Sequence, residues 1–351
     1  MMDGIGVARC YHADVVASLV LRRWPGLPHA AARLGSGSDV LGLDDQLSRD
    51  HDWGLRLTLL VEADMVDVVS AHLEERLPET YRDLPTRFAT SWEPTIRQRV
   101  QVATAEEFAA SRLGLDVSGV ITSLDWLCLT GQAVLEVTGG PVFADSLGAL
   151  TGLRQKLAWY PDDVWCHVVA ADWIRLGDDL PVFGRAGQRG DDLGNRVVGG
   201  RMARTAMHLA FLLARQWPPY AKWAGTMFSQ LPTAGDLSPL LTAAVAAESW
   251  KQRQDAMLRA LAVLHQAQRD AGLPTSEGEP TEPNTCRPDF GVRGPVPRLL
   301  LDAITDPRLR ELPAGVGSLE QWLDSVRVLM NAPDRIQTAR AYLRTAARPI
   351  S

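Results

Sequence analysis

The sequence predicts an α+β fold in which a small mixed-sheet domain, over about residues 1–140, is followed by an all-helical domain over residues 141–351. Three observations favour this arrangement. The chain has 351 residues, which is more than one small hydrophobic core usually organises. Strand-like and helix-like patterns follow one another in the first part, whereas the patterns beyond about residue 145 are mostly helical.

The first domain is predicted from a mixture of helical and extended patterns. Apolar residues recur at helical spacing between Val15 and Val20, and they alternate as on one face of a strand from Leu55 to Leu59. The expected elements are a helix over 13–23, a brief extended segment over 29–34, a strand from 55, a helix over 66–76, and a strand from 99 that leads into a helix.

The second domain is predicted from a succession of helical patterns with proline breaks. Pro161 and the pair Pro218 and Pro219 mark ends of helices. Ser318 with Gln321 forms a capping box for a last pair of helices. The expected helices cover 146–159, 162–176, 192–216 and 238–269, and the Pro-, Glu- and Thr-rich stretch 272–291 is expected to be an exposed linker or surface loop.

The composition narrows the classes of function. With 46% hydrophobic and 22% charged residues the chain resembles an ordinary globular protein, and a net charge of -6 argues against a protein that coats nucleic acid through a general basic field. The four cysteines lie far apart and form no CxxC pair, which fits buried thiols in a reducing cytoplasm. The N-terminal apolar run is short and ends in two arginines, so we expect neither a signal peptide nor a membrane span, and a cytoplasmic protein.

An acidic segment, RDHDWGLRL, offers a metal site. If it is a strand, Asp50 and Asp52 point to one side and His51 and Trp53 to the other. Two carboxylates ~5 Å apart repel by about 3 kcal/mol at an effective dielectric constant of 20. A cation between them removes that cost, and hard oxygen ligands favour Mg²⁺ or Mn²⁺. The alternative is a solvated edge strand.

A glycine-serine turn just upstream predicts a phosphate site. Gly35, Ser36 and Gly37 allow backbone N–H groups to approach an anion, and the hydroxyls of Ser36 and Ser38 can donate as well. Arg49 either binds phosphate or pairs with the acids of this loop. Those acids, Asp39, Asp44 and Asp45, fit turn formers and helix caps better than metal ligands.

These residues carry a resemblance to a known family. Leu34-Gly35-Ser36 followed by Asp50-His51-Asp52 resembles the signature of the nucleotidyltransferase superfamily with the polymerase-beta-type fold. Together with LRQKLAWYPDDVW and FLLARQWPPYAKWAG, it is similar to a bacterial family of nucleotidyltransferase-like proteins, over about residues 30–228. The resemblance implies a small mixed sheet that holds the metal and a helical domain that closes over the nucleotide. It also implies transfer of a nucleoside monophosphate from an NTP to a hydroxyl of a small, antibiotic-like molecule or a macromolecule, with release of pyrophosphate.

One position departs from the pattern of the superfamily. Its active members place a third carboxylate on a neighbouring strand, where this chain has Gln101, and an amide cannot act as a base near neutral pH. Asp116 or Glu93 takes that role if the strands align differently. Lys156, close to Arg154, is a candidate to reach the triphosphate from the helical domain. Without a third carboxylate the alternative is a nucleotide-binding or interaction protein, antitoxin-like or regulatory, that keeps the fold.

Overall fold

The computed structural model describes residues 2–45, 52–283 and 291–347 of the chain. It divides into two compact units. The first, which we call the sheet unit, comprises Met1–Val120 and Ala133–Ala158, and the second, which we call the helical unit, comprises Ile121–Gln132 and Trp159–Ser351. The predicted α+β class, with a small mixed sheet and a long helical region, is confirmed.

The sheet unit is built on a four-stranded mixed sheet with the order β7-β2-β1-β8. Its central strand β1 runs antiparallel to β2 and to β8, while β2 and β7 run parallel. The fourth strand therefore comes from residues beyond 140, the boundary expected from the sequence, and the sheet unit continues to Ala158. The strands are β1 (Ala30–Ala32), β2 (Leu57–Leu60), β7 (Val100–Ala103) and β8 (Val142–Asp145).

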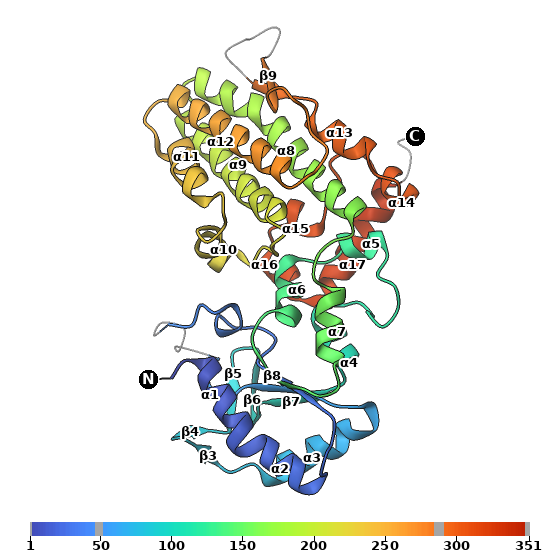
Figure 1. Cartoon of the computed structure of the whole chain (residues 1–351). Helices are drawn as coiled ribbons and strands as arrows, with labels where there is room; N and C mark the ends of the chain where they lie inside the picture. The colour runs from blue at the N-terminus through green and yellow to red at the C-terminus, as the bar shows by residue number, and fades with distance from the viewer. Residues whose placement is uncertain (1, 46–51, 284–290, 348–351) are drawn as a thin grey trace. The chain divides into compact units, whose positions relative to one another are not determined.

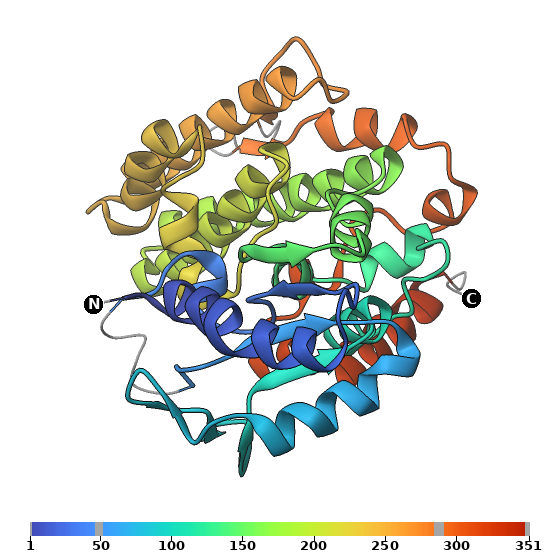
Figure 2. The same cartoon turned by 60° about the horizontal axis from the view of Figure 1, so that its bottom comes forward.

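Helices from the first quarter of the chain cover this sheet (Figure 2). A continuous helical stretch joins α1 (Gly4–Tyr11), η1 (His12–Val16) and α2 (Ala17–Arg23), so it begins earlier than the helix expected over 13–23. Within the described residues this stretch, Gly4–Arg23, is the one long and apolar enough to cross a membrane. In the structure its apolar side chains pack with those of β2 and α3 (Val66–Arg76) in the core of the sheet unit.

Shorter elements complete the sheet unit. The helix α4 (Ala105–Leu113) begins at a capping box formed by Thr104 and Glu107 and ends at Gly114, whose φ is 75°. An antiparallel hairpin is formed by β5 (Arg87–Thr90) and β6 (Glu93–Gln98). The other elements are η2 (Asp39–Leu41), η4 (Ala63–Met65), β3 (Thr80–Tyr81), β4 (Leu84–Pro85), α6 (Gly131–Thr138), which begins in the residues of the helical unit, and α7 (Ala149–Lys156).

Four long helices form the centre of the helical unit and lie side by side in Figure 1. They are α8 (Asp162–Gln188), α9 (Asp192–Leu213), α11 (Ala234–Ala246) and α12 (Trp250–Asp270). The prediction of a single helix over 238–269 is wrong, because two helices, α11 and α12, cover this range. The backbone leaves the helical conformation at Ala247, where ψ is 148°, and Ser249 then caps the start of α12.

The remaining elements of the helical unit are short, apart from α17. The capping box predicted at Ser318 and Gln321 is confirmed. The Pro-rich stretch contains the strand β9 (Thr281–Pro283), which pairs antiparallel with β10 (Gly291–Arg293) at the end of the stretch. The other elements are α5 (Ser123–Leu127), α10 (Ala221–Phe228), α13 (Val296–Asp302), α14 (Pro307–Arg310), α15 (Leu319–Trp322), α16 (Val326–Met330) and α17 (Ala332–Ala346).

Candidate functional site

A buried ion pair holds the inner side of the glycine-serine turn that follows β1. The Arg33 guanidinium donates from Nε to Asp39 Oδ2 over 2.6 Å and from Nη2 to Asp39 Oδ1 over 2.9 Å. Nη2 also donates to the carbonyl oxygen of Ser36 over 3.0 Å. Asp39 therefore organises the loop, as the sequence indicated, and the Arg33 charge is already neutralised.

Two glycines give the turn its shape. Gly35 has a φ of 82° and Gly37 a φ of 139°, a region that favours glycine. A Cβ atom at Gly37 would lie 2.2 Å from Asp39 Oδ1, so only glycine fits there. The Gly35 N–H donates to the carbonyl oxygen of Glu136 over 2.8 Å and is not available to an anion in this arrangement.

The side chains of two further arginines, which were not predicted from the sequence, reach the turn. Arg112, on α4, places its guanidinium carbon 3.5 Å from the position a Cβ of Gly35 would occupy. Arg56, just before β2, places Nη2 3.4 Å from Ser36 Oγ. The turn that was predicted to bind phosphate is therefore surrounded by the guanidinium groups of Arg33, Arg56 and Arg112.

The charge of Arg56 is less well compensated than that of its neighbours. Arg33 pairs with Asp39, and Arg112 Nη1 lies 3.7 Å from Glu136 Oε2. Among the described residues, no carboxylate forms an ion pair with Arg56, which donates hydrogen bonds to Ser36 Oγ and to the carbonyl oxygen of Asp52. Burial lowers the pKa of Arg56, and the nearby Arg33 guanidinium lowers it further. An anion bound at the turn would stabilise the charged form of Arg56.

The predicted metal pair is described only in part. Asp50 and Arg49 lie outside the described residues. The expectation that Asp52 lies on a strand is wrong, because its φ is 59° and β2 begins only at Leu57. Its carboxylate accepts hydrogen bonds from the Ser91 N–H, over 2.6 Å, and from the Ser91 hydroxyl.

No metal centre is formed by the residues that the structure describes. Within them, no group of three or more His, Cys, Asp or Glu side chains is placed to hold a metal ion. Both carboxylate oxygens of Asp52 accept hydrogen bonds from Ser91. The assignment of Mg²⁺ or Mn²⁺ to Asp50 and Asp52 stays a prediction.

The three candidates for the third carboxylate position lie in different surroundings. Gln101, on β7, is the register partner of Thr58 on β2, and its Oε1 accepts from Arg112 Nη2 over 3.1 Å. Glu93, on β6, accepts from the N–H of Thr95. Asp116 follows α4, and a hydrogen bond from the Ser118 N–H lowers its pKa. Of the three, Gln101 is the one whose side chain contacts an arginine of the turn.

Lys156 and Ser38 are engaged with backbone groups. The Lys156 ammonium, at the end of α7, donates to the carbonyl oxygens of Val117 and Gly119. Ser38 accepts at its carbonyl oxygen from the N–H groups of Leu41 and Leu43, over 3.1 and 2.9 Å. In this structure Lys156 holds the loop after α4, and its role toward a triphosphate stays a prediction.

The chain is similar to one protein family and to a solved structure. Residues 126–224 match the family model described as domain of unknown function (DUF4037). The chain is similar to the crystal structure of a nucleotidyltransferase-like protein from Exiguobacterium sibiricum, with 15% sequence identity, a TM-score of 0.34, and 76% of each chain covered. No curated protein matches the chain.

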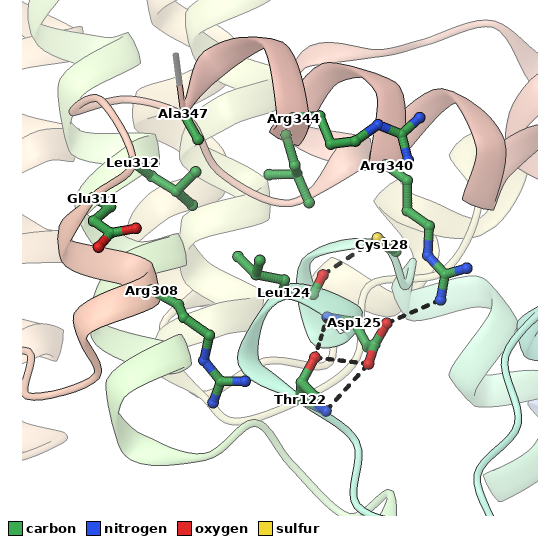
Figure 3. A pocket seen from close by; sticks show the side chains of 11 residues that line it. Thr122, Leu124, Asp125, Cys128, Arg308, Glu311, Leu312, Arg340, Arg344 and Ala347 are labelled. Atoms are coloured by element: carbon green, nitrogen blue, oxygen red, sulfur yellow. Dashed lines mark hydrogen bonds and ion pairs between the residues drawn. The ribbon is translucent and has the colours of Figure 1, made fainter. Parts of the chain in front are cut away.

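A separate pocket of about 340 Å³ lies within the helical unit (Figure 3). Its charged groups are largely paired: Arg340 Nη2 lies 3.1 Å from Asp125 Oδ1, and Arg308 pairs with Asp306 outside the lining. Burial raises the pKa of the Cys128 thiol to about 11, so the thiol is protonated and a poor nucleophile at neutral pH. The pocket is lined by Thr122, Leu124, Asp125, Cys128, Arg308, Glu311, Leu312, Arg340, Leu343, Arg344 and Ala347.

A buried charge cluster in the helical unit joins two residues of the matched region, His208 and Asp172, to Glu320 outside it. His208 Nδ1 is 2.6 Å from Asp172 Oδ2, and His208 Nε2 is 3.7 Å from Glu320 Oε1. Burial lowers the pKa of His208, but the two carboxylates outweigh it and raise the pKa to about 10. Glu320 also accepts from the N–H of Gly131. The protonated imidazole lies between the two carboxylates and offsets part of their charge, which indicates a structural role.

Proposed function

We propose that the sheet unit binds the phosphate groups of a nucleoside triphosphate at the turn of residues 35–37. The observation that carries this proposal is the arrangement of Arg33, Arg56 and Arg112 around the turn, in which Arg56 has no ion pair among the described residues. Guanidinium groups bind phosphate oxygens through two parallel hydrogen bonds. Arg56 and Arg112 supply such donors, and the Ser36 hydroxyl supplies another.

Saturating nucleotide should therefore stabilise the fold. A ligand that binds only the folded protein, present at 100 times its dissociation constant, adds about 2.7 kcal/mol to the free energy of unfolding. We expect ATP to raise the melting temperature by several degrees in a thermal-shift assay run with Mg²⁺ and again with EDTA. A shift that survives EDTA is expected if the arginines carry the binding. If none of the four NTPs changes the melting temperature, the phosphate site is refuted.

A second candidate function is catalytic. It is the Mg²⁺-dependent transfer of a nucleoside monophosphate from an NTP to a hydroxyl of a small molecule or a macromolecule, with release of pyrophosphate. Position 101 lies where a third carboxylate would be needed, on β7 next to β2 and in contact with Arg112 beside the turn, although the glutamine there supplies no base. The metal ligands in this proposal are Asp50 and Asp52. Of these two, Asp50 lies outside the described residues.

Gln101→Glu separates the catalytic proposal from the binding proposal. A glutamate there restores a carboxylate beside the turn, and we expect faster pyrophosphate release with little change in folding. The measurement is pyrophosphate release with Mg²⁺ and each NTP, alone and with a panel of hydroxylated acceptors. If Asp116 or Glu93 supplies the carboxylate instead, Asp116→Asn or Glu93→Gln abolishes turnover and Gln101→Glu changes little. If neither the wild type nor any of the three variants releases pyrophosphate while nucleotide binding is intact, the protein binds nucleotide without transferase activity.

A further inference from the structure

An exposed tryptophan stands at the tip of the hairpin formed by β5 and β6. Trp92 lies between the two strands, and 53% of its surface is exposed. A large aromatic side chain left this exposed loses the free energy that its burial would provide. The position therefore suggests a ligand that covers the ring.

The hairpin tip is fixed beside the phosphate site by two contacts. The Asp52 carboxylate accepts from both the N–H and the hydroxyl of the adjacent Ser91. The Arg56 guanidinium carbon lies 4.8 Å from the centroid of the Trp92 ring. The same guanidinium reaches Ser36 Oγ over 3.4 Å, so Arg56 links the ring directly to the glycine-serine turn.

We propose that Trp92 stacks on the base of the nucleotide whose phosphates occupy the turn of residues 35–37. This inference rests on the proposed function. Every nucleobase offers a flat face to an aromatic ring, and an arginine beside that ring adds cation–π attraction. A nucleotide has its phosphates and its base at opposite ends of a ribose, and the contacts from Ser36 through Arg56 to Trp92 provide one partner for each end. In this arrangement Asp52 acts as a positioning residue, because it holds the tip that carries Trp92.

The alternative is a ligand that needs the phosphate site alone, such as inorganic triphosphate. Such a ligand would bind Arg56 and Arg112 without touching Trp92. Comparing ATP with inorganic triphosphate therefore isolates the contribution of the base.

The experiment titrates ATP and, separately, inorganic triphosphate into the full chain and three variants by calorimetry. Trp92→Ala is expected to weaken ATP binding about tenfold and to leave triphosphate binding unchanged, because stacking on one base is lost. Trp92→Phe, which keeps an aromatic face, should retain most of the ATP affinity. Ile96→Ala removes another exposed apolar side chain from the same hairpin, 72% exposed, and should change neither affinity.

The possible results distinguish this inference from the proposed function. Unchanged ATP affinity in Trp92→Ala overturns the stacking and leaves the phosphate site standing. Equal losses for ATP and triphosphate also overturn it, because Trp92 would then act only by supporting Arg56. If the wild type binds neither ligand, the phosphate site and the stacking proposal both fall.

Discussion

Asp39→Asn should lower the free energy of unfolding of the sheet unit by about 3–5 kcal/mol, the usual cost of removing one partner from a buried ion pair. The side chains of Arg33 and Asp39 are 3% and 11% exposed, so water cannot replace the lost carboxylate. Asparagine keeps the shape and can still accept one hydrogen bond, but it leaves the guanidinium charge buried and uncompensated. The loss is measured by urea denaturation monitored by circular dichroism.

An exposed pair of the same chemistry provides the control. Arg298 and Asp302 lie 3.5 Å apart in an i,i+4 pair, with side chains 86% and 67% exposed. Asp302→Asn should therefore change the free energy of unfolding by less than about 1 kcal/mol. If Asp39→Asn cost no more than Asp302→Asn, the buried pair would not be what holds the glycine-serine turn.

Elements with a clear local signal could be predicted from the sequence. The helix expected over 66–76 is α3, and the strand expected from residue 99 is β7 followed by α4. The break between α11 and α12 was missed because neither proline nor glycine marks it, and its one local signal is the capping box of Ser249 and Gln252. The strand β8 was missed because its four residues become a strand only by pairing with the distant β1.

The candidate site could be predicted only where it is local in sequence. The motif at Gly35 and Ser36 indicated a turn near bound phosphate, and the structure shows a turn that only glycine can form at Gly37. Arg56 and Arg112 were missed because they reach that turn through the sheet and through α4, which no spacing rule reveals. Asp52 was placed on a strand by extrapolating the alternation of β2 backwards, whereas the positive φ angles of Asp52 and Gly54 bend the chain before the strand begins.

Arg56→Gln should weaken nucleotide binding by at least about tenfold. A hydrogen bond to a charged group contributes about 1.5–3 kcal/mol, and 1.4 kcal/mol corresponds to a tenfold change in affinity. Glutamine keeps an amide donor near Ser36 but removes the positive charge. Folding should be little affected, since Arg56 has no ion pair among the described residues and its charge is disfavoured by burial and by Arg33. The loss should appear for ATP and for inorganic triphosphate alike, because both place phosphate at the turn.

The most direct test of the phosphate site is calorimetric titration of ATP into the wild type, Arg56→Gln and Arg344→Gln. Arg344 is an exposed arginine of α17 and belongs to the helical unit, so its substitution makes the same change in net charge without altering the sheet unit. We expect the wild type and Arg344→Gln to bind ATP equally well and Arg56→Gln to bind it at least about tenfold more weakly. Equal affinities for all three proteins, or a loss confined to Arg344→Gln, would contradict a phosphate site at residues 35–37.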